Sequence, residues 1–282
     1  MGLLGRSLDM ALEHGLEDDA GRAYANLVCI EYELLDNSRA QAMLDAGIPY
    51  CLEHDLDYMR LYMQGWKAAL LLRRGAWEAA SAEALGVLGS ADGTGHFAYP
   101  AMTVLARLHT RCGAAPAEPM LDAMRAYLER GMELQRFAPF AATMAERAWL
   151  GLADPQESLA LLDRALDQAR DPALIPEILL WLRLLAPERA QPTVGRLAEP
   201  WRLHLSGDWR AAAAVWAAVG APYEQAWRCS RATPGPSDAR WQRWSPSGSG
   251  SRRTMCALCC AGAGSRPSPS ALAPRPEPTR PA

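Results

Sequence analysis

The stretch HDLDYMRLYMQGWKAALLLRRGAWEAA, residues His54–Ala80, contains a long amphipathic run, a short break and the start of a second run. In the first run Met59, Met63 and Leu70 recur at the three- and four-residue spacing of one face of an α-helix. Gly75 interrupts the pattern, and an alanine-rich segment begins directly afterwards. Glycine favours the end of a helix, so the stretch predicts two helices joined by a tight turn.

The same break recurs along the chain up to about residue 228, which predicts an array of helical hairpins. Breaks near Asp36, Gly75, Gly113 and Asp154 are about 40 residues apart, enough for two helices and two turns. No strand-like alternation or hairpin dipeptide lies between them. We therefore expect an all-α domain over residues 1–228, an α-solenoid of antiparallel hairpins that resembles tetratricopeptide repeats, although the strict tetratricopeptide pattern is never complete.

Stacking explains why such hairpins need one another. One hairpin cannot bury both of its faces, so neighbours must share a continuous core, and small residues after each break allow close approach. Trp77 and Trp209 each lie two residues after a glycine. We expect these two side chains to fill the gaps between successive hairpins.

The charge distribution argues against nucleic-acid binding by the helical part. The whole chain has a formal charge of −3, but residues 229–282 hold eight arginines against Asp238 and Glu277, which leaves about −9 for the rest. A domain that grips phosphates normally carries an excess of positive charge. No apolar stretch reaches the roughly 20 residues of a membrane span, and the first residues do not read as a secretory signal, so we expect a cytoplasmic chain with no membrane partner.

Motifs that would carry chemistry are missing from the sequence. No Gly-rich phosphate loop precedes a Lys-Ser or Lys-Thr pair, and the only lysine, Lys67, follows a tryptophan in mid-helix. The segment CALCC at Cys256–Cys260 has no second pair of cysteines or histidines to complete a four-ligand metal shell. We therefore expect no enzyme, no catalytic residue, no cofactor and no metal.

One group of aromatic residues suggests a binding surface. Repeat arrays often bind partners on their concave face, and the helix around Tyr58, Tyr62 and Trp66 could line such a groove. His96 lies in a predicted loop beside two further aromatic residues and could touch a ligand. Core packing is the alternative explanation for the three residues on the helix, and a surface or packing role is the alternative for His96.

The last part of the chain, residues 229–282, differs in composition from everything before it. Proline, serine, glycine and arginine predominate, as in disordered segments. A reading frame shifted by one nucleotide would turn Trp241, Trp244, Cys256 and Cys259 into Leu, Met or Val, at spacings that suit an amphipathic helix. A frameshifted tail and an authentic disordered tail both remain open, and neither is expected to pack as written.

Three stretches resemble one family of regulators. GRAYANL at Gly21–Leu27, the quoted stretch at His54–Ala80 and LSGDWRAAAAVWAAVGAPYEQA at Leu205–Ala226 are similar to the C-terminal half of large LuxR-type ATP-dependent transcription regulators. In that family an ATPase module of the AAA or STAND type precedes a tetratricopeptide-like sensor, and a DNA-binding helix-turn-helix follows it. Walker motifs and a readable helix-turn-helix are both missing from this sequence, so none of the family's ATP- or DNA-contacting residues can be transferred to it.

The resemblance implies a non-catalytic sensor and protein-interaction segment, a fragment or frameshifted product that receives a protein or small-molecule signal. The alternative is an independent tetratricopeptide-like adaptor that holds a peptide or partner protein in its groove. An upstream ATPase reading frame together with a downstream helix-turn-helix in the shifted frame would favour the regulator. An enzyme would instead require a cleft of convergent polar groups.

Overall fold

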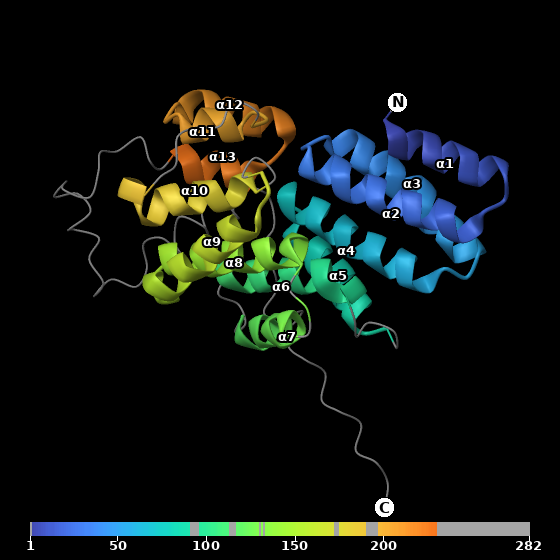
Figure 1. Ribbon diagram of the computed structural model, residues 1–282, viewed down its shortest axis with the longest axis horizontal. Helices are drawn as coiled ribbons and strands as arrows, with labels where there is room; N and C mark the ends of the chain where they lie inside the picture. Colours follow the sequence, from blue (N-terminus) through green and yellow to red (C-terminus); the bar gives the residue numbers. More distant parts are fainter. Residues whose placement is uncertain are drawn as a thin grey trace, which may run out of the picture.

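The computed structural model describes residues 2–90, 96–112, 117–129, 131, 133–171, 175–189 and 197–229, with the backbone alone for His96 and 226–229. The predicted all-α array is confirmed, since these residues form helices and no strand (Figure 1). The predicted tail, with Cys256–Cys260, lies outside the described residues, apart from Cys229 at the end of the last helix. The helices are α1 (Leu3–Glu13), α2 (Glu17–Glu33), α3 (Asn37–Glu53), α4 (Asp57–Arg73), α5 (Trp77–Leu88), η1 (His96–Ala98), α6 (Tyr99–Cys112), α7 (Glu118–Leu128), α8 (Leu134–Trp149), α9 (Pro155–Gln168), α10 (Pro176–Leu185), η3 (Pro187–Arg189), α11 (Trp201–Leu205), α12 (Trp209–Val219) and α13 (Pro222–Cys229).

One turn recurs between successive helices. Its middle residue takes a left-handed backbone conformation, and the next residue donates its N–H to a carbonyl five positions earlier, as Asp36 does to Glu31 at 2.9 Å. This is the bond that closes a Schellman turn. The left-handed residues are Gly15, Leu35, Asp55, Gly75, Gly151, Gly207 and Gly220. The first four are 20 residues apart, so helix plus turn is a strict module in the N-terminal half.

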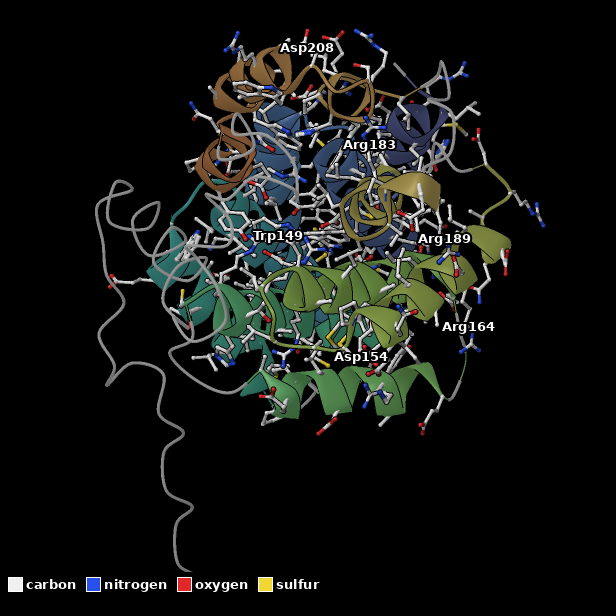
Figure 2. All side chains as sticks on the ribbon, turned by 90° about the vertical axis from the view of Figure 1, so that its left-hand side faces the viewer. Trp149, Asp154, Arg164, Arg183, Arg189 and Asp208 are labelled. Atoms are coloured by element: carbon white, nitrogen blue, oxygen red, sulfur yellow. The ribbon has the colours of Figure 1, made fainter. Side chains whose placement is uncertain are left out.

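Three aspartates fix where helices begin. The side chains of Asp36, Asp154 and Asp208 accept a backbone N–H from the first turns of α3, α9 and α12, respectively. Such N-caps satisfy donors that the helix itself cannot. In Figure 2, Asp208 lies at the top of the molecule and Asp154 in its lower half, so the same signal acts in separate hairpins. The predicted breaks at Asp36, Gly75 and Asp154 are observed, and Gly113 lies outside the described residues.

The helices form two layers. Helix α2 packs on α4, α4 on α6, α6 on α8 and α8 on α10, whereas α3, α5, α7 and α9 pack on members of this first series. Because α2, α4, α6, α8 and α10 pack on one another in succession, this even series forms the inner layer of a curved array (Figure 1). Small residues at the fourth helical position are buried, as the sequence predicts, at Ala20, Ala40, Ala80, Ser158 and Ala212.

The C-terminal helices return toward the N-terminal half. In Figure 1, α12 and α13 lie across the open side of the arc, toward α2 and α3. The Asn37 side chain donates a hydrogen bond of 2.7 Å to the Val219 carbonyl, although 182 positions separate the two residues. The array is therefore closed between the first turn of α3 and the end of α12. None of the helices described has the length and apolar character that crossing a bilayer requires.

Candidate functional site on the inner helices

The predicted groove residues Tyr58, Tyr62 and Trp66 share one face of the inner helix α4. Tyr62 and Trp66 lie together, with their ring centroids 6.1 Å apart, and both are half-buried. Tyr58 is 37% exposed, and its ring centroid lies 5.0 Å from that of Phe97. The backbone of His96 begins the short helix η1, next to Phe97, and its side chain is outside the described residues. The three α4 residues therefore form one aromatic row on the inner layer.

The aromatic row continues onto helix α2 and meets an arginine. The rings of Tyr32 and Trp66 have centroids 5.0 Å apart, and the Arg73 guanidinium lies 3.4 Å from the Tyr32 ring centroid. Arg73 also donates to the Tyr32 carbonyl at 2.7 Å and to the Asn37 side chain at 3.0 Å. A cation over an aromatic face is attracted by the ring quadrupole. Arg73 therefore links the aromatic row to the point where the array closes.

Burial keeps the polar tips of this row uncharged. Burial raises the pKa of the Tyr62 phenol, as does the neighbouring Cys29. The pKa of Cys29 is raised to about 12, chiefly by burial and then by the carboxylate of Glu33. Both groups are neutral near pH 7 and can act only as neutral hydrogen-bonding groups there.

An ion pair extends the site to helices α6, α8 and α10. Arg107 donates to both Glu177 carboxylate oxygens, at 3.0 and 2.9 Å, and its Nε contacts the Thr143 hydroxyl at 3.3 Å. The Trp181 indole donates to the same carboxylate at 3.4 Å. Burial alone would raise the pKa of Glu177, but the charge of Arg107 and these hydrogen bonds bring it below the ordinary value. Glu177 is therefore ionised and held in a fixed orientation at neutral pH.

A second ion pair lies next to the first and is more deeply buried. Arg111 Nε donates to Glu146 at 2.8 Å, and the two side chains are 4% and 1% exposed. Tyr223 of α13 donates its hydroxyl to the same carboxylate at 2.5 Å, and the Arg111 guanidinium lies 3.8 Å from the Tyr223 ring centroid. Burial alone would lower the pKa of Arg111, but Glu146 raises it well above its ordinary value.

The two predicted packing tryptophans occupy different environments. Trp77, the first residue of α5, is 5% exposed, and its ring centroid lies 6.0 Å from that of Tyr223. Trp209, the first residue of α12, is half-buried, with the Arg210 guanidinium 4.8 Å from its ring centroid. Trp77 thus belongs to the contact between the array and α13, whereas Trp209 lies at the edge of the C-terminal hairpin.

These side chains form two groups, the inner stripe and the Tyr223 socket. The inner stripe consists of the residues that run across α2, α4, α6 and α10, namely Tyr32, Tyr62, Trp66, Arg73, Arg107 and Glu177. The Tyr223 socket consists of Trp77, Arg111 and Glu146, which surround the Tyr223 side chain.

Sequence reasoning did not identify the charged members of either group. Arg107 and Arg111 are four residues apart in a largely apolar helix, and this spacing places both on one face. Glu146 lies between Ala145 and Arg147 in the alanine-rich second half of α8. Charges on an apolar helix face were the available signal, but their partners Glu177 and Tyr223 are 70 or more positions away.

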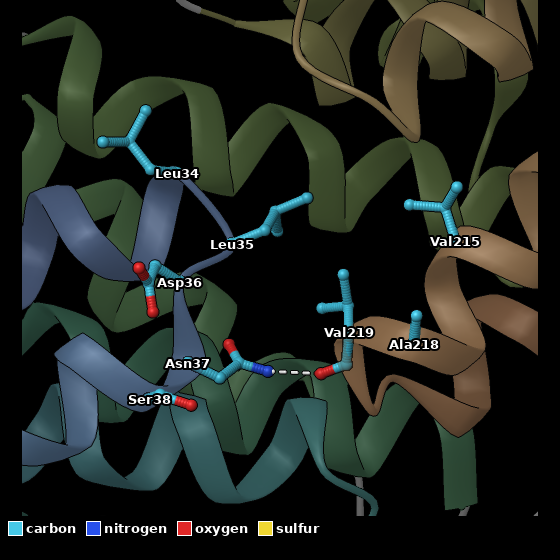
Figure 3. Close-up of a pocket in the computed structure, with 8 residues that line it drawn as sticks. All are labelled: Leu34, Leu35, Asp36, Asn37, Ser38, Val215, Ala218 and Val219. Atoms are coloured by element: carbon cyan, nitrogen blue, oxygen red, sulfur yellow. Dashed lines mark hydrogen bonds between the residues drawn. The ribbon is translucent and has the colours of Figure 1, made fainter.

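A shallow pocket marks the closure of the array (Figure 3). It has a volume of about 390 Å³ and lies between the α2–α3 turn and the end of α12. The dashed hydrogen bond from Asn37 to Val219 crosses its floor. Leu35 and Val215 contribute apolar side chains from opposite sides. The Asp36 carboxylate at its rim already caps α3, so it is committed to a structural bond.

Among the described residues, no three His, Cys, Asp or Glu side chains lie close enough together to hold a metal ion. Comparisons with protein-family models, with curated proteins and with solved structures gave no match. The inner stripe and the Tyr223 socket therefore have to be interpreted from their own chemistry.

Proposed function

We propose that this chain is a non-catalytic binding module that receives a protein or small-molecule signal on its inner stripe. One observation carries the proposal: aromatic rings and oriented guanidinium groups line up across three inner helices, from Trp66 through Tyr32 and Arg73 to Arg107. Aromatic residues and arginine dominate the energetics of protein interfaces because they bury large areas and form directed bonds. Their placement on the inner layer of a helical array matches the surface that such arrays use for partners.

We further propose that the module is the sensor segment of a LuxR-type regulator. The support is the resemblance of Gly21–Leu27, His54–Ala80 and Leu205–Ala226 to that family. The adaptor remains the competing proposal, in which the same surface serves a free-standing protein. The genomic DNA separates them: an ATPase module encoded upstream, with a helix-turn-helix in the shifted frame downstream, is expected for the regulator and contradicts the adaptor.

Site-specific photo-crosslinking tests the binding surface. A benzoylphenylalanine placed at Tyr58, beside the inner stripe, is expected to crosslink a partner in the native host, and mass spectrometry then identifies it. The matched control carries the same group at Leu52, which is 64% exposed on the outer helix α3. Equal crosslinking at both positions would contradict a binding surface on the inner layer.

A variant of the stripe itself completes the test. Arg107→Gln removes the charge that holds Glu177 and is expected to weaken capture at position 58 about tenfold or more, as loss of a directed charged contact does at interfaces. Arg125→Gln, at an exposed ion pair between outer helices, serves as its control and should leave capture unchanged. A partner captured equally by both variants would place the interface elsewhere.

A further inference from the structure

Tyr223 of helix α13 reaches into the array. Tyr223 is 5% exposed, and it contacts α5 through Trp77, α6 through Arg111 and α8 through Glu146. Among the described elements only α12 packs along the length of α13. Among the described side chains of α13, Tyr223 therefore forms an attachment point that reaches three helices of the array at once.

The socket is complementary to a phenol in three respects. Glu146 accepts the hydroxyl proton, the Arg111 cation covers the ring face, and the Trp77 ring approaches at an interplanar angle of 60°. Arg111 donates to both Glu146 oxygens, at 2.8 and 3.2 Å, and so holds the carboxylate in place. A phenylalanine would leave the carboxylate without one donor, and an anionic group in place of the hydroxyl would be repelled by it.

The next residue of α13 adds to the electrostatic match. The charge of Glu224 contributes to the raised pKa of Arg111, so the two groups are close enough to interact. One carboxylate oxygen of Glu224 is buried and has no hydrogen-bond partner among the described residues. The pair Tyr223-Glu224 therefore presents a donor to Glu146 and a negative charge toward Arg111, a combination that a partner helix could reproduce.

We propose that the Tyr223 socket is a receptor site for a tyrosine on an amphipathic helix, and that α13 fills it in cis. Release of Tyr223 then frees α13 and opens the closed side of the array, where Asn37 holds Val219. This regulatory part rests on the proposed binding function, because it controls access to the inner stripe. The specificity of the socket for a phenol does not rest on it.

Rescue by a side-chain analogue tests the specificity in the full-length chain. Tyr223→Ala empties the socket, and 4-methylphenol, which is the tyrosine side chain itself, is expected to raise the thermal midpoint of this variant but not that of the wild type. Toluene fills the same space without the hydroxyl and is expected to bind about tenfold more weakly, because it leaves Glu146 without a donor. Equal stabilisation by both compounds, or none by 4-methylphenol, would overturn the proposal.

Hydrogen exchange tests the release and does not depend on the alanine variant being well folded. Tyr223→Phe keeps the ring and loses one hydrogen bond, so amides of α13 and of the first turn of α3 are expected to exchange about tenfold faster than in the wild type. Tyr127→Phe, on the outer helix α7, is the matched control and should leave both segments unchanged. Unchanged exchange in Tyr223→Phe would show that Tyr223 does not hold the array closed. No partner takes part in either experiment, so their outcome is separate from that of the crosslinking test.

Discussion

The two halves of this array reach the same layered architecture by different means. In the N-terminal half, α2, α3 and α4 are each 17 residues long, and the left-handed turn residues are 20 positions apart. From α6 onward the helices vary between 5 and 16 residues, and their connections vary as well. A strict module needs no special contacts to continue, because every hairpin offers the next one the same surface.

The charges differ in the same way. Ion pairs of the N-terminal half lie near the surface, as in Arg60–Asp57 and Lys67–Glu83. The C-terminal half buries Arg111–Glu146 and half-buries Arg107–Glu177. Burying an ion pair seldom adds stability compared with apolar packing. Any arrangement that separates the partners is nevertheless strongly destabilised, because it leaves a buried charge uncompensated. The irregular half thus fixes its unique arrangement with charges, whereas the regular half fixes it by geometry.

The largest effect on stability is expected from breaking the buried ion pair between Arg111 and Glu146. Glu146→Gln keeps the shape of the side chain but leaves the buried Arg111 charge uncompensated, which should lower the free energy of unfolding by roughly 3–5 kcal/mol. Urea denaturation followed by circular dichroism measures this. Glu157→Gln is the control, since Glu157 and its partner Arg125 are each about half exposed, and it should cost less than about 1 kcal/mol. A similar loss of unfolding free energy in the two variants would contradict the view that buried charges fix the arrangement of the C-terminal half.

A smaller effect is expected where the regular half relies on close approach. A Cβ at Gly47 of α3 would lie 2.8 Å from the Tyr24 Cβ of α2, and neither atom can rotate away. Gly47→Ala should therefore destabilise the protein by about 2 kcal/mol despite the better helix propensity of alanine. Gly86 of α5 has no atom within 4 Å of its added Cβ, so Gly86→Ala should stabilise by about 0.5–1 kcal/mol. Thermal unfolding measures the change in stability of both variants. A change of the same sign in the two would contradict close packing at Gly47.

The sequence predicts most of the fold because turn chemistry is local. Gly75 supplies the left-handed residue of its turn, and Asp36 caps the following helix, as their residue types suggest. The strict 20-residue module was not apparent, because Leu35 and Asp55 take the left-handed position that glycine normally fills. At those two turns the packing of the 17-residue helices on each side imposes the left-handed conformation. The residue type at the turn does not predict it.

The candidate site was less predictable than the fold. The aromatic row of Tyr62 and Trp66 is readable because i and i+4 residues share a helix face. Tyr32 joins this row only because helices α2 and α4 cross at a particular angle. Tyr223 reaches Glu146 only because the chain returns toward the array after the last repeat. Contacts of this range follow from the curvature of the whole array, which the spacing of residues in one helix does not specify.

The smallest effect is expected from the half-buried pair of the inner stripe, and it depends on pH. The folded-state pKa of Glu177 is lower than its ordinary value of about 4.3, with Arg107 and Trp181 holding the charged form against the cost of burial. Its contribution to stability is therefore complete above about pH 5 and is lost as the pH falls through the lowered folded pKa.

The difference in unfolding free energy between wild type and Glu177→Gln measures this contribution, because the other carboxylates titrate alike in both proteins. We expect about 1 kcal/mol from pH 7 down to about pH 5 and a decline toward zero below that, since Glu177 is about one-third exposed and solvent screens its pair. A difference that grew on acidification would mean that Glu177 binds its proton more tightly in the folded state. Arg107 would then not control its charge, and the inner stripe would lack the fixed anion assigned to it.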